Sequence, residues 1–188
     1  PYCNQLNELL RDVASQTCEE ISLARATIEF DGTVLRSSEC VDGAERGFSP
    51  HHPKDPSYYP LTAHLAQTGQ LLGVWNRPGN VHDSVGAAEH LAALLADVRR
   101  RLGSIPLEVR LDGAFFHEAV LGVLTASRVE YAVKVPMWKW LGVRQRIAAR
   151  GNWECVNGSL DAFSTRLHIE TWDRTERSVV CAICDVAF

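Results

Sequence analysis

The segment from residue 107 to residue 136 places the strongest constraint on the fold of this 188-residue chain. It reads LEVRLDG, then HEAVLGVLTASR, then EYAVKVP, which is a strand pattern, a helical pattern and a second strand pattern. Two strands joined by a helical crossover lie parallel in one sheet, and the crossover is almost always right-handed. The segment therefore predicts a βαβ unit and a partly parallel sheet.

The remaining patterns extend this unit into a mixed sheet covered by helices, which is an α/β architecture. An amphipathic helix is expected at 3–20, because apolar residues recur there at helical spacing. The other expected elements are a strand at 26–37, a hairpin at 61–79 that turns at Thr68-Gly69, a helix at 84–103 with Ser84 as its N-cap, a short helix at 137–150 and three polar strands within 153–188.

Two of the expected strands carry an aspartate followed by a glycine. Asp112 is expected at the carboxyl end of its strand and Asp31 near the middle of its own, so they meet only if the two strands are neighbours. Burying a charge is costly unless something pairs with it, so these carboxylates can indicate a shared divalent cation and phosphoryl-transfer chemistry. Asp-Gly is also common in turns, and the two residues alone leave both interpretations equally open.

Composition narrows the classes of protein to which the chain can belong. Hydrophobic residues make up 46% and charged residues 22%, as in a globular protein. No apolar run reaches the roughly 20 residues that cross a bilayer, and the N-terminus has no secretory-signal pattern, so no membrane association is expected. The six cysteines are scattered, which favours reduced thiols in a cytoplasmic protein.

Charge is distributed unevenly along the chain. The net charge of −4 argues mildly against a general nucleic-acid coat, yet residues 128–150 hold six basic residues and one acidic residue. Tyr131, Trp138 and Trp140 lie between these basic residues, a pattern typical of a phosphate-contacting surface. The pattern is equally compatible with a solvated helix face whose tryptophans anchor it to the core.

Several common catalytic motifs are missing from the sequence. FDGTV resembles the strand that opens haloacid-dehalogenase phosphatases, but Glu29 occupies the position where those enzymes need a nucleophilic aspartate. There is no GxSxG elbow, no glycine-rich phosphate loop and no HxxxH spacing. A two-metal phosphoryl-transfer site explains the aspartate pair better than these alternatives.

Connected segments of the chain carry a more specific resemblance. They are IEFDGTVLRS, the long loop and hairpin GFSPHHPKDPSYYPLTAHLAQTGQLLGVWNRPGNVHDSVGA, then VRLDGAFFHEAVLGVL and YAVKVPM. Together, over residues 26–137, the chain resembles bacterial insertion-sequence transposases with a DDE catalytic triad on a ribonuclease H-like fold. The continuation RPGN-x-H is far more specific than the Asp-Gly pairs.

The resemblance implies that Asp31 and Asp112 are the first two acids of the triad and bind Mg²⁺ or Mn²⁺. It further implies that the enzyme cuts a DNA strand at the transposon end and joins the freed 3′-hydroxyl to target DNA. The expected partners are therefore DNA and, in the full-length form, a second copy of the chain. The residues expected to line the cleft or contact DNA are Arg77, Asn80, His82, Lys134 and Lys139.

The sequence departs from the family pattern at its third acid. That residue is a glutamate on a helix that follows a β-strand insertion, and residues 153–188 resemble the start of such an insertion. Glu154, Glu170 and Glu176 all fall in strand or turn patterns. We therefore expect a catalytic-core fragment that is inactive alone.

The expected domains are an N-terminal helical segment at 1–25, a partial ribonuclease H-like catalytic core at 26–150 and the start of the β insertion at 151–188. An alternative function is a non-catalytic module of the same fold that binds DNA or protein.

Overall fold

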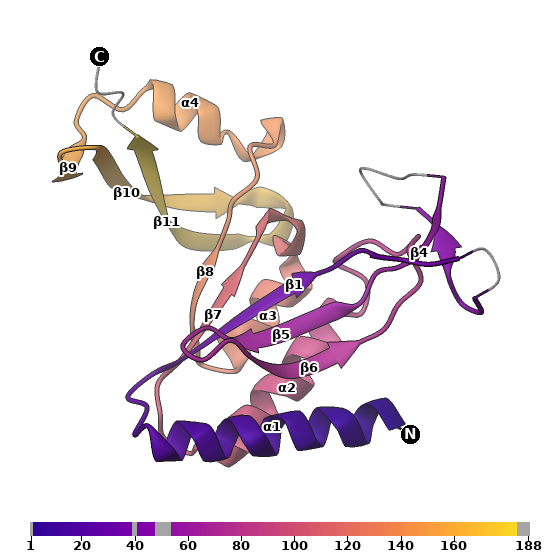
Figure 1. Ribbon diagram of the computed structural model, residues 1–188. Coiled ribbons are helices and arrows are strands. Elements are labelled where there is room, and N and C mark those ends of the chain that lie inside the picture. The colour runs from indigo at the N-terminus through magenta and orange to yellow at the C-terminus, as the bar shows by residue number, and fades with distance from the viewer. Residues whose placement is uncertain (1, 39–40, 48–53, 184–188) are drawn as a thin grey trace. The chain divides into compact units, whose positions relative to one another are not determined.

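The computed structural model describes residues 2–38, 41–47 and 54–183 (Figure 1). The chain forms two compact units, Pro1–Val135 and Pro136–Phe188. This division differs from the sequence-based boundaries at 25 and 150, which stay predictions as functional domains. None of the helices in the described ranges is long and apolar enough to cross a membrane.

A five-stranded mixed sheet forms the centre of the first unit (Figure 1). In spatial order its strands are β6 (Gln70–Trp75), β5 (Leu61–Leu65), β1 (Ala26–Gly32), β7 (Leu107–Leu111) and β8 (Glu130–Val133). β1 runs antiparallel to β5 and parallel to β7, and β7 runs parallel to β8. The mixed α/β fold and the βαβ unit expected from the sequence are therefore confirmed.

Apolar residues alternate along the strands and bury one face of this sheet. Phe30 lies at the centre of that face, with its ring centroid 5.4 Å from Phe115 and 5.7 Å from Trp75. Trp75 in turn stacks on His90 of the covering helix at 5.1 Å. Figure 1 shows two helices behind the sheet, α2 (Ala87–Leu102) and α3 (Glu118–Ala126).

Helix α1 (Tyr2–Glu20) covers the free edge of β6. The Asn7 side chain donates to the Val74 carbonyl at 3.0 Å and accepts from the Val74 amide at 2.9 Å. Arg11 donates to the Leu72 carbonyl at 3.3 Å and pairs with Asp97 of α2 at 2.5 Å. An edge strand with unpaired backbone groups can pair with another chain and aggregate. Here α1 covers the edge and bonds to backbone groups of β6. This packing places the N-terminal helix in the same unit as the sheet.

The strand expected at 26–37 is shorter than the sequence suggested. β1 ends at Gly32, because its partner in β5 at that point is Leu61, the first residue of that strand. The chain then enters a separate three-stranded sheet of order β2-β4-β3. Its strands are β2 (Leu35–Arg36), β3 (Glu45–Arg46) and β4 (Pro56–Tyr58).

The start of α2 also differs from the expectation. Ser84 is not the N-cap, since the helix begins at Ala87 and Gly86 precedes it with φ of 72°. The Ser84 hydroxyl instead lies 3.0 Å from Nδ1 of His82. The expected end is confirmed, because the Gly103 amide donates to the Arg99 carbonyl.

The second unit contains a three-stranded antiparallel sheet of order β11-β10-β9, as the sequence predicted. Glu154 begins β9, Glu170 lies in a 3-10 turn and Glu176 lies in β11. None of the three lies on an α-helix, in agreement with the sequence interpretation. The elements of this unit are η2 (Lys139–Leu141), α4 (Val143–Ala148), β9 (Glu154–Asn157), β10 (Leu160–Ile169), η3 (Glu170–Trp172) and β11 (Arg174–Ile183).

The tryptophans of the basic stretch are partly exposed. Trp138 is 42% exposed and Trp140 is 52% exposed, and their rings stack with centroids 5.5 Å apart. Leu141 and Val143 are the buried residues of this segment. The Trp140 ring also lies edge-on to the Trp172 ring, with centroids 5.9 Å apart. Both interpretations of this stretch stay predictions.

Candidate active site

Asp31 and Asp112 lie side by side at the carboxyl ends of two neighbouring parallel strands. β1 and β7 are paired in register, with Phe30 opposite Leu111, and each aspartate is the next residue along its chain. Asp31 is one residue from the end of β1, not near its middle as the sequence suggested, because the strand stops at Gly32. The condition for the two carboxylates to meet is therefore fulfilled. Ligands of sheets with parallel strands collect at this end.

A backbone amide orients each carboxylate. Oδ1 of Asp31 accepts a hydrogen bond from the Gly32 amide at 2.8 Å. Oδ1 of Asp112 accepts from the Ala114 amide at 2.8 Å and caps a short 3-10 turn. Both side chains are exposed. The local backbone thus holds two solvent-facing carboxylates at the carboxyl ends of β1 and β7.

The electrostatics show that negative charge is crowded around Asp31. Partial burial raises the pKa of the Asp31 carboxyl, and repulsion from Asp112 and Asp83 raises it further. The hydrogen bond from Gly32 and the charge of His64 act in the opposite direction. Other carboxylates oppose the ionisation of such a group, and a nearby cation favours its ionised form.

The face of the sheet that carries Asp31 is polar. Alternation puts Glu29 on the same face of β1, where it lies opposite His64 of β5, while Asp31 lies opposite Thr62. On β7, Arg110 is paired with Ala132 of β8 on this face. Glu29 and Arg110 are 52% and 53% exposed in their side chains. This face therefore contributes solvated charge next to the aspartates.

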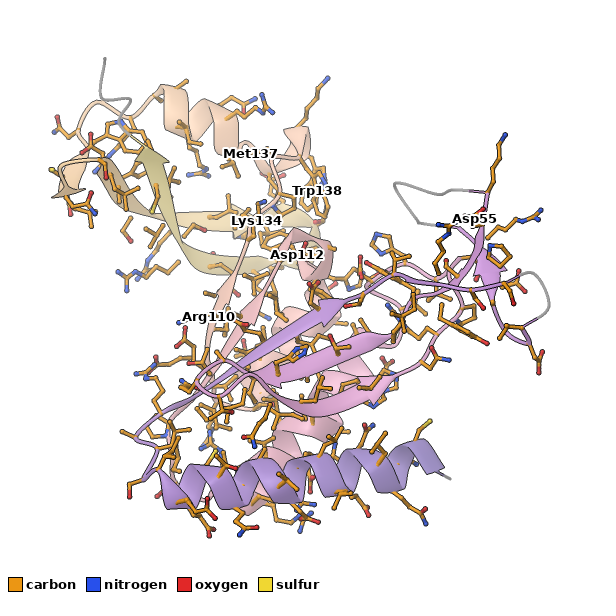
Figure 2. The ribbon with its side chains drawn as sticks, viewed as in Figure 1. Asp55, Arg110, Asp112, Lys134, Met137 and Trp138 are labelled. Carbon is orange, nitrogen blue, oxygen red and sulfur yellow. The ribbon has the colours of Figure 1, made fainter. Side chains whose placement is uncertain are left out.

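Lys134 lies next to Asp112. Its amide donates to the Leu111 carbonyl at 3.1 Å, which continues the pairing of β7 and β8 by one residue. The side chain is exposed, and Figure 2 shows Lys134 and Asp112 at the same end of these strands. Of the residues predicted to contact DNA, Lys134 is thus placed beside the carboxylate pair.

The other predicted DNA contacts are placed differently. Asn80 and His82 are exposed on the loop that follows β6. Arg77 is only 7% exposed, and its guanidinium donates to backbone carbonyls of its own chain. Lys139 is exposed in η2 of the second unit. Whether any of these residues contacts DNA stays a prediction.

Asp83 is the acidic neighbour of Asp31 that sequence reasoning missed. It lies on the loop between β6 and α2, outside any strand, and its side chain is 15% exposed. The clue was available in the sequence, because Asp83 follows Arg77 by six residues within the same loop and can form an ion pair with it. In the part of the chain that the structure describes, no three His, Cys, Asp or Glu side chains are grouped as a metal site.

Residues 3–185 match the family model described as Transposase DDE domain group 1. The chain belongs to this DDE transposase family. The match includes both strand-end aspartates and the antiparallel strands of the second unit. Membership in this family implies the use of a divalent metal ion. No curated protein matches the chain in sequence.

Solved structures of transposases resemble the chain at low similarity. The Mos1 transposase paired-end complex with left transposon end is 12% identical with a TM-score of 0.42, covering 77% of this chain and 54% of that chain. The piggyBac transposase synaptic complex with hairpin DNA is 13% identical with a TM-score of 0.45, covering 86% and 34%. The catalytic domain of Mos1 mariner transposase is 9% identical with a TM-score of 0.42, covering 83% and 76%.

This DDE transposase chain thus spans 54% of the Mos1 chain and 34% of the piggyBac chain. Its family assignment rests on the family model.

Proposed function

We propose that Asp31 and Asp112 together bind Mg²⁺ or Mn²⁺ and form the catalytic carboxylates of a DNA transposase. The observation that supports this most strongly is the parallel register of β1 and β7, which makes the two residues neighbours. The proposed reaction is cleavage of a DNA strand and transfer of the freed 3′-hydroxyl to target DNA, in the cytoplasm. The proposed partners are the transposon ends, the target DNA and a second copy of the chain in the full-length enzyme.

The residues at the site fit such a cation. Mg²⁺ and Mn²⁺ prefer carboxylate oxygens, and both aspartates come from rigid strands with a backbone amide orienting each one. A bound divalent cation would supply activation of the attacking hydroxyl and stabilisation of the leaving oxygen. The chain's own contribution is to hold the two carboxylates adjacent and to orient each one with a backbone amide.

We further propose that exposed polar groups of the chain contact the DNA backbone. Lys134, beside Asp112, is the best supported of them because it is exposed at the same strand ends. Asn80, His82 and Lys139 are exposed and available for such contacts. Arg77 has the weakest support, since its guanidinium is engaged inside the protein. Phosphate contacts of this kind set register without reading sequence.

Mn²⁺ binding tests the metal site directly. The affinity of the purified chain is measured by the electron paramagnetic resonance signal of free Mn²⁺ during titration. Asp31→Asn and Asp112→Asn should each weaken binding, and the double variant should abolish it. Glu29→Gln is the matched control, because it removes an exposed carboxylate from the same face of the same strand. Binding that persists unchanged in the double variant contradicts the proposal.

A second experiment tests the DNA contacts and the alternative function. Duplex DNA binding is followed by fluorescence anisotropy at several salt concentrations. Lys134→Ala should reduce the slope of log K against log salt by about one. Lys54→Ala is the control, since this exposed lysine lies in the turn before β4 of the small three-stranded sheet. A slope that is unchanged in Lys134→Ala contradicts the contact.

The alternative is a non-catalytic module that binds DNA or protein. It is favoured by one observation, namely that the described residues offer two carboxylates and no third ligand grouped with them. DNA binding without any detectable Mn²⁺ binding in the parent chain would support the alternative and contradict the catalytic-core proposal.

A further inference from the structure

A partly buried cluster of polar side chains lies close to Gly32, the last residue of the strand that carries Asp31. It consists of Arg77, Asp83 and Tyr59. The Arg77 guanidinium lies 3.9 Å from Oδ1 of Asp83 and stands over the Tyr59 ring at 5.4 Å from its centroid. Burial, followed by the neighbouring Asp83 carboxylate, raises the pKa of the Tyr59 hydroxyl. Tyr59 therefore keeps its proton.

Arg77 ties two segments of backbone together. Its Nε donates to the Tyr59 carbonyl at 3.0 Å, at the approach to β5. Its Nη1 donates to the carbonyls of His82 at 3.1 Å and Val85 at 2.8 Å, in the loop before α2. A planar guanidinium can satisfy several acceptors in fixed directions, whereas a lysine ammonium cannot reproduce that fork. Arg77 thus fixes the loop from which Asp83 projects.

The side chains of Asp83 and Tyr59 pack closely against Gly32. A Cβ atom at Gly32 would lie 2.4 Å from Oδ1 of Asp83 and 2.7 Å from Cζ of Tyr59, so only glycine fits. Gly32 is also the residue whose amide donates to the Asp31 carboxylate. The cluster therefore packs against the residue whose backbone amide orients the Asp31 carboxylate.

We infer that Arg77, Asp83 and Tyr59 are positioning residues that act through Gly32 to hold the Asp31 carboxylate beside Asp112. The inference rests on the proposed function of Asp31 as a metal-binding carboxylate. Asp83 is assigned a positioning role, because its Oδ1 atom is buried close to Gly32. Arg77 balances its charge and fixes its loop.

The Gly32 amide reports on this positioning without any metal. In ¹⁵N-labelled chain, Arg77→Lys should shift the Gly32 amide resonance and speed its hydrogen exchange, because the loop that presses on Gly32 is released. Arg99→Lys is the matched control. It removes another arginine fork, which holds the carbonyls of Gly103 and Ile105 at the far end of α2, and it should leave the Gly32 amide unchanged. An unchanged Gly32 amide in folded Arg77→Lys overturns the inference.

Asp83→Asn provides the deciding measurement if Arg77→Lys does not fold. It keeps the size of the side chain but removes the charge that pairs with Arg77. It should shift the Gly32 amide in the same direction, and an unchanged amide in this variant likewise overturns the inference.

Metal affinity separates this inference from the proposed function. In folded Arg77→Lys, Mn²⁺ affinity should fall by about 10–100-fold, the range found for groups that orient metal ligands, while Arg99→Lys binds normally. If the parent chain binds no Mn²⁺, the proposed function fails, yet the Gly32 amide still decides the positioning role. If the parent binds Mn²⁺ and Arg77→Lys binds it equally well, the positioning inference fails alone.

Discussion

The two faces of the five-stranded sheet have different chemistry. Ile28 and Phe30 of β1 point into an apolar face that α2 and α3 cover, and both are at most 2% exposed. Glu29 and Asp31, the residues between and after them, point to the opposite face and are exposed. Neighbouring residues of one strand thus belong to environments that differ in polarity and in access to water.

This difference separates stability from function within one strand. The covered face supplies the burial of apolar surface that holds the unit together. The polar face carries crowded carboxylates, which cost stability and become useful when a cation binds. Substitutions on the covered face should therefore act on folding, and substitutions on the polar face should act on ligand binding with little loss of stability.

Phe30→Ala should have the largest effect. Phe30 is 2% exposed and packs against the rings of Trp75 and Phe115, so its removal leaves a cavity in the core. We expect a loss of about 3–5 kcal/mol in the free energy of unfolding, measured by urea denaturation. The adjacent control Glu29→Ala should change it by no more than about 0.5 kcal/mol. Similar losses in the two variants would break the comparison between faces.

Asn7→Ala should have an intermediate effect at the edge of the sheet. Asn7 is 3% exposed and satisfies both the amide and the carbonyl of Val74. Leaving buried backbone groups without partners should cost about 1–3 kcal/mol in urea denaturation. The exposed Gln16→Ala on the same helix is the control, and its side chain bonds only to Glu20. Equal effects of the two would mean that α1 does not protect this edge through Asn7.

The sequence predicted the features that follow from periodicity. The βαβ unit, the hairpin that turns at Thr68-Gly69 and the end of α2 at Gly103 are all confirmed. Alternation also placed aspartates on strands, and the adjacency of β1 and β7 brings them together. These features depend on local pattern, which a single sequence carries.

Features that depend on contacts between distant segments were missed. The start of α2 at Ala87 and the role of Asp83 both depend on the loop that Arg77 organises by donating to carbonyls of residues 59, 82, 83 and 85. The early end of β1 follows from where β5 begins. A loop that is organised around one buried guanidinium has no periodicity, so its conformation cannot be read from spacing alone.

Asp31→Asn should have the smallest effect on stability, and its sign should be opposite to that of the other variants. The folded state raises the pKa of Asp31 above its ordinary value of 3.8, so ionisation of this carboxyl opposes folding. Below pH 3.8 the carboxyl is neutral and does not oppose folding. As the pH rises through the raised pKa, the carboxyl ionises and the free energy of unfolding falls. The asparagine variant should therefore melt at a slightly higher temperature than the parent at pH 7.

The difference in melting temperature between Asp31→Asn and the parent should vanish near pH 3. At that pH the aspartic acid of the parent is neutral, as the asparagine of the variant is at every pH. Thermal melts of the parent and the variant, followed by circular dichroism between pH 3 and pH 7, measure this difference. A parent chain that is more stable than Asp31→Asn at pH 7 would mean that Asp31 supports the fold. The polar face would then contribute to stability, and the separation between the two faces of β1 would fail at the residue on which the proposed metal site depends.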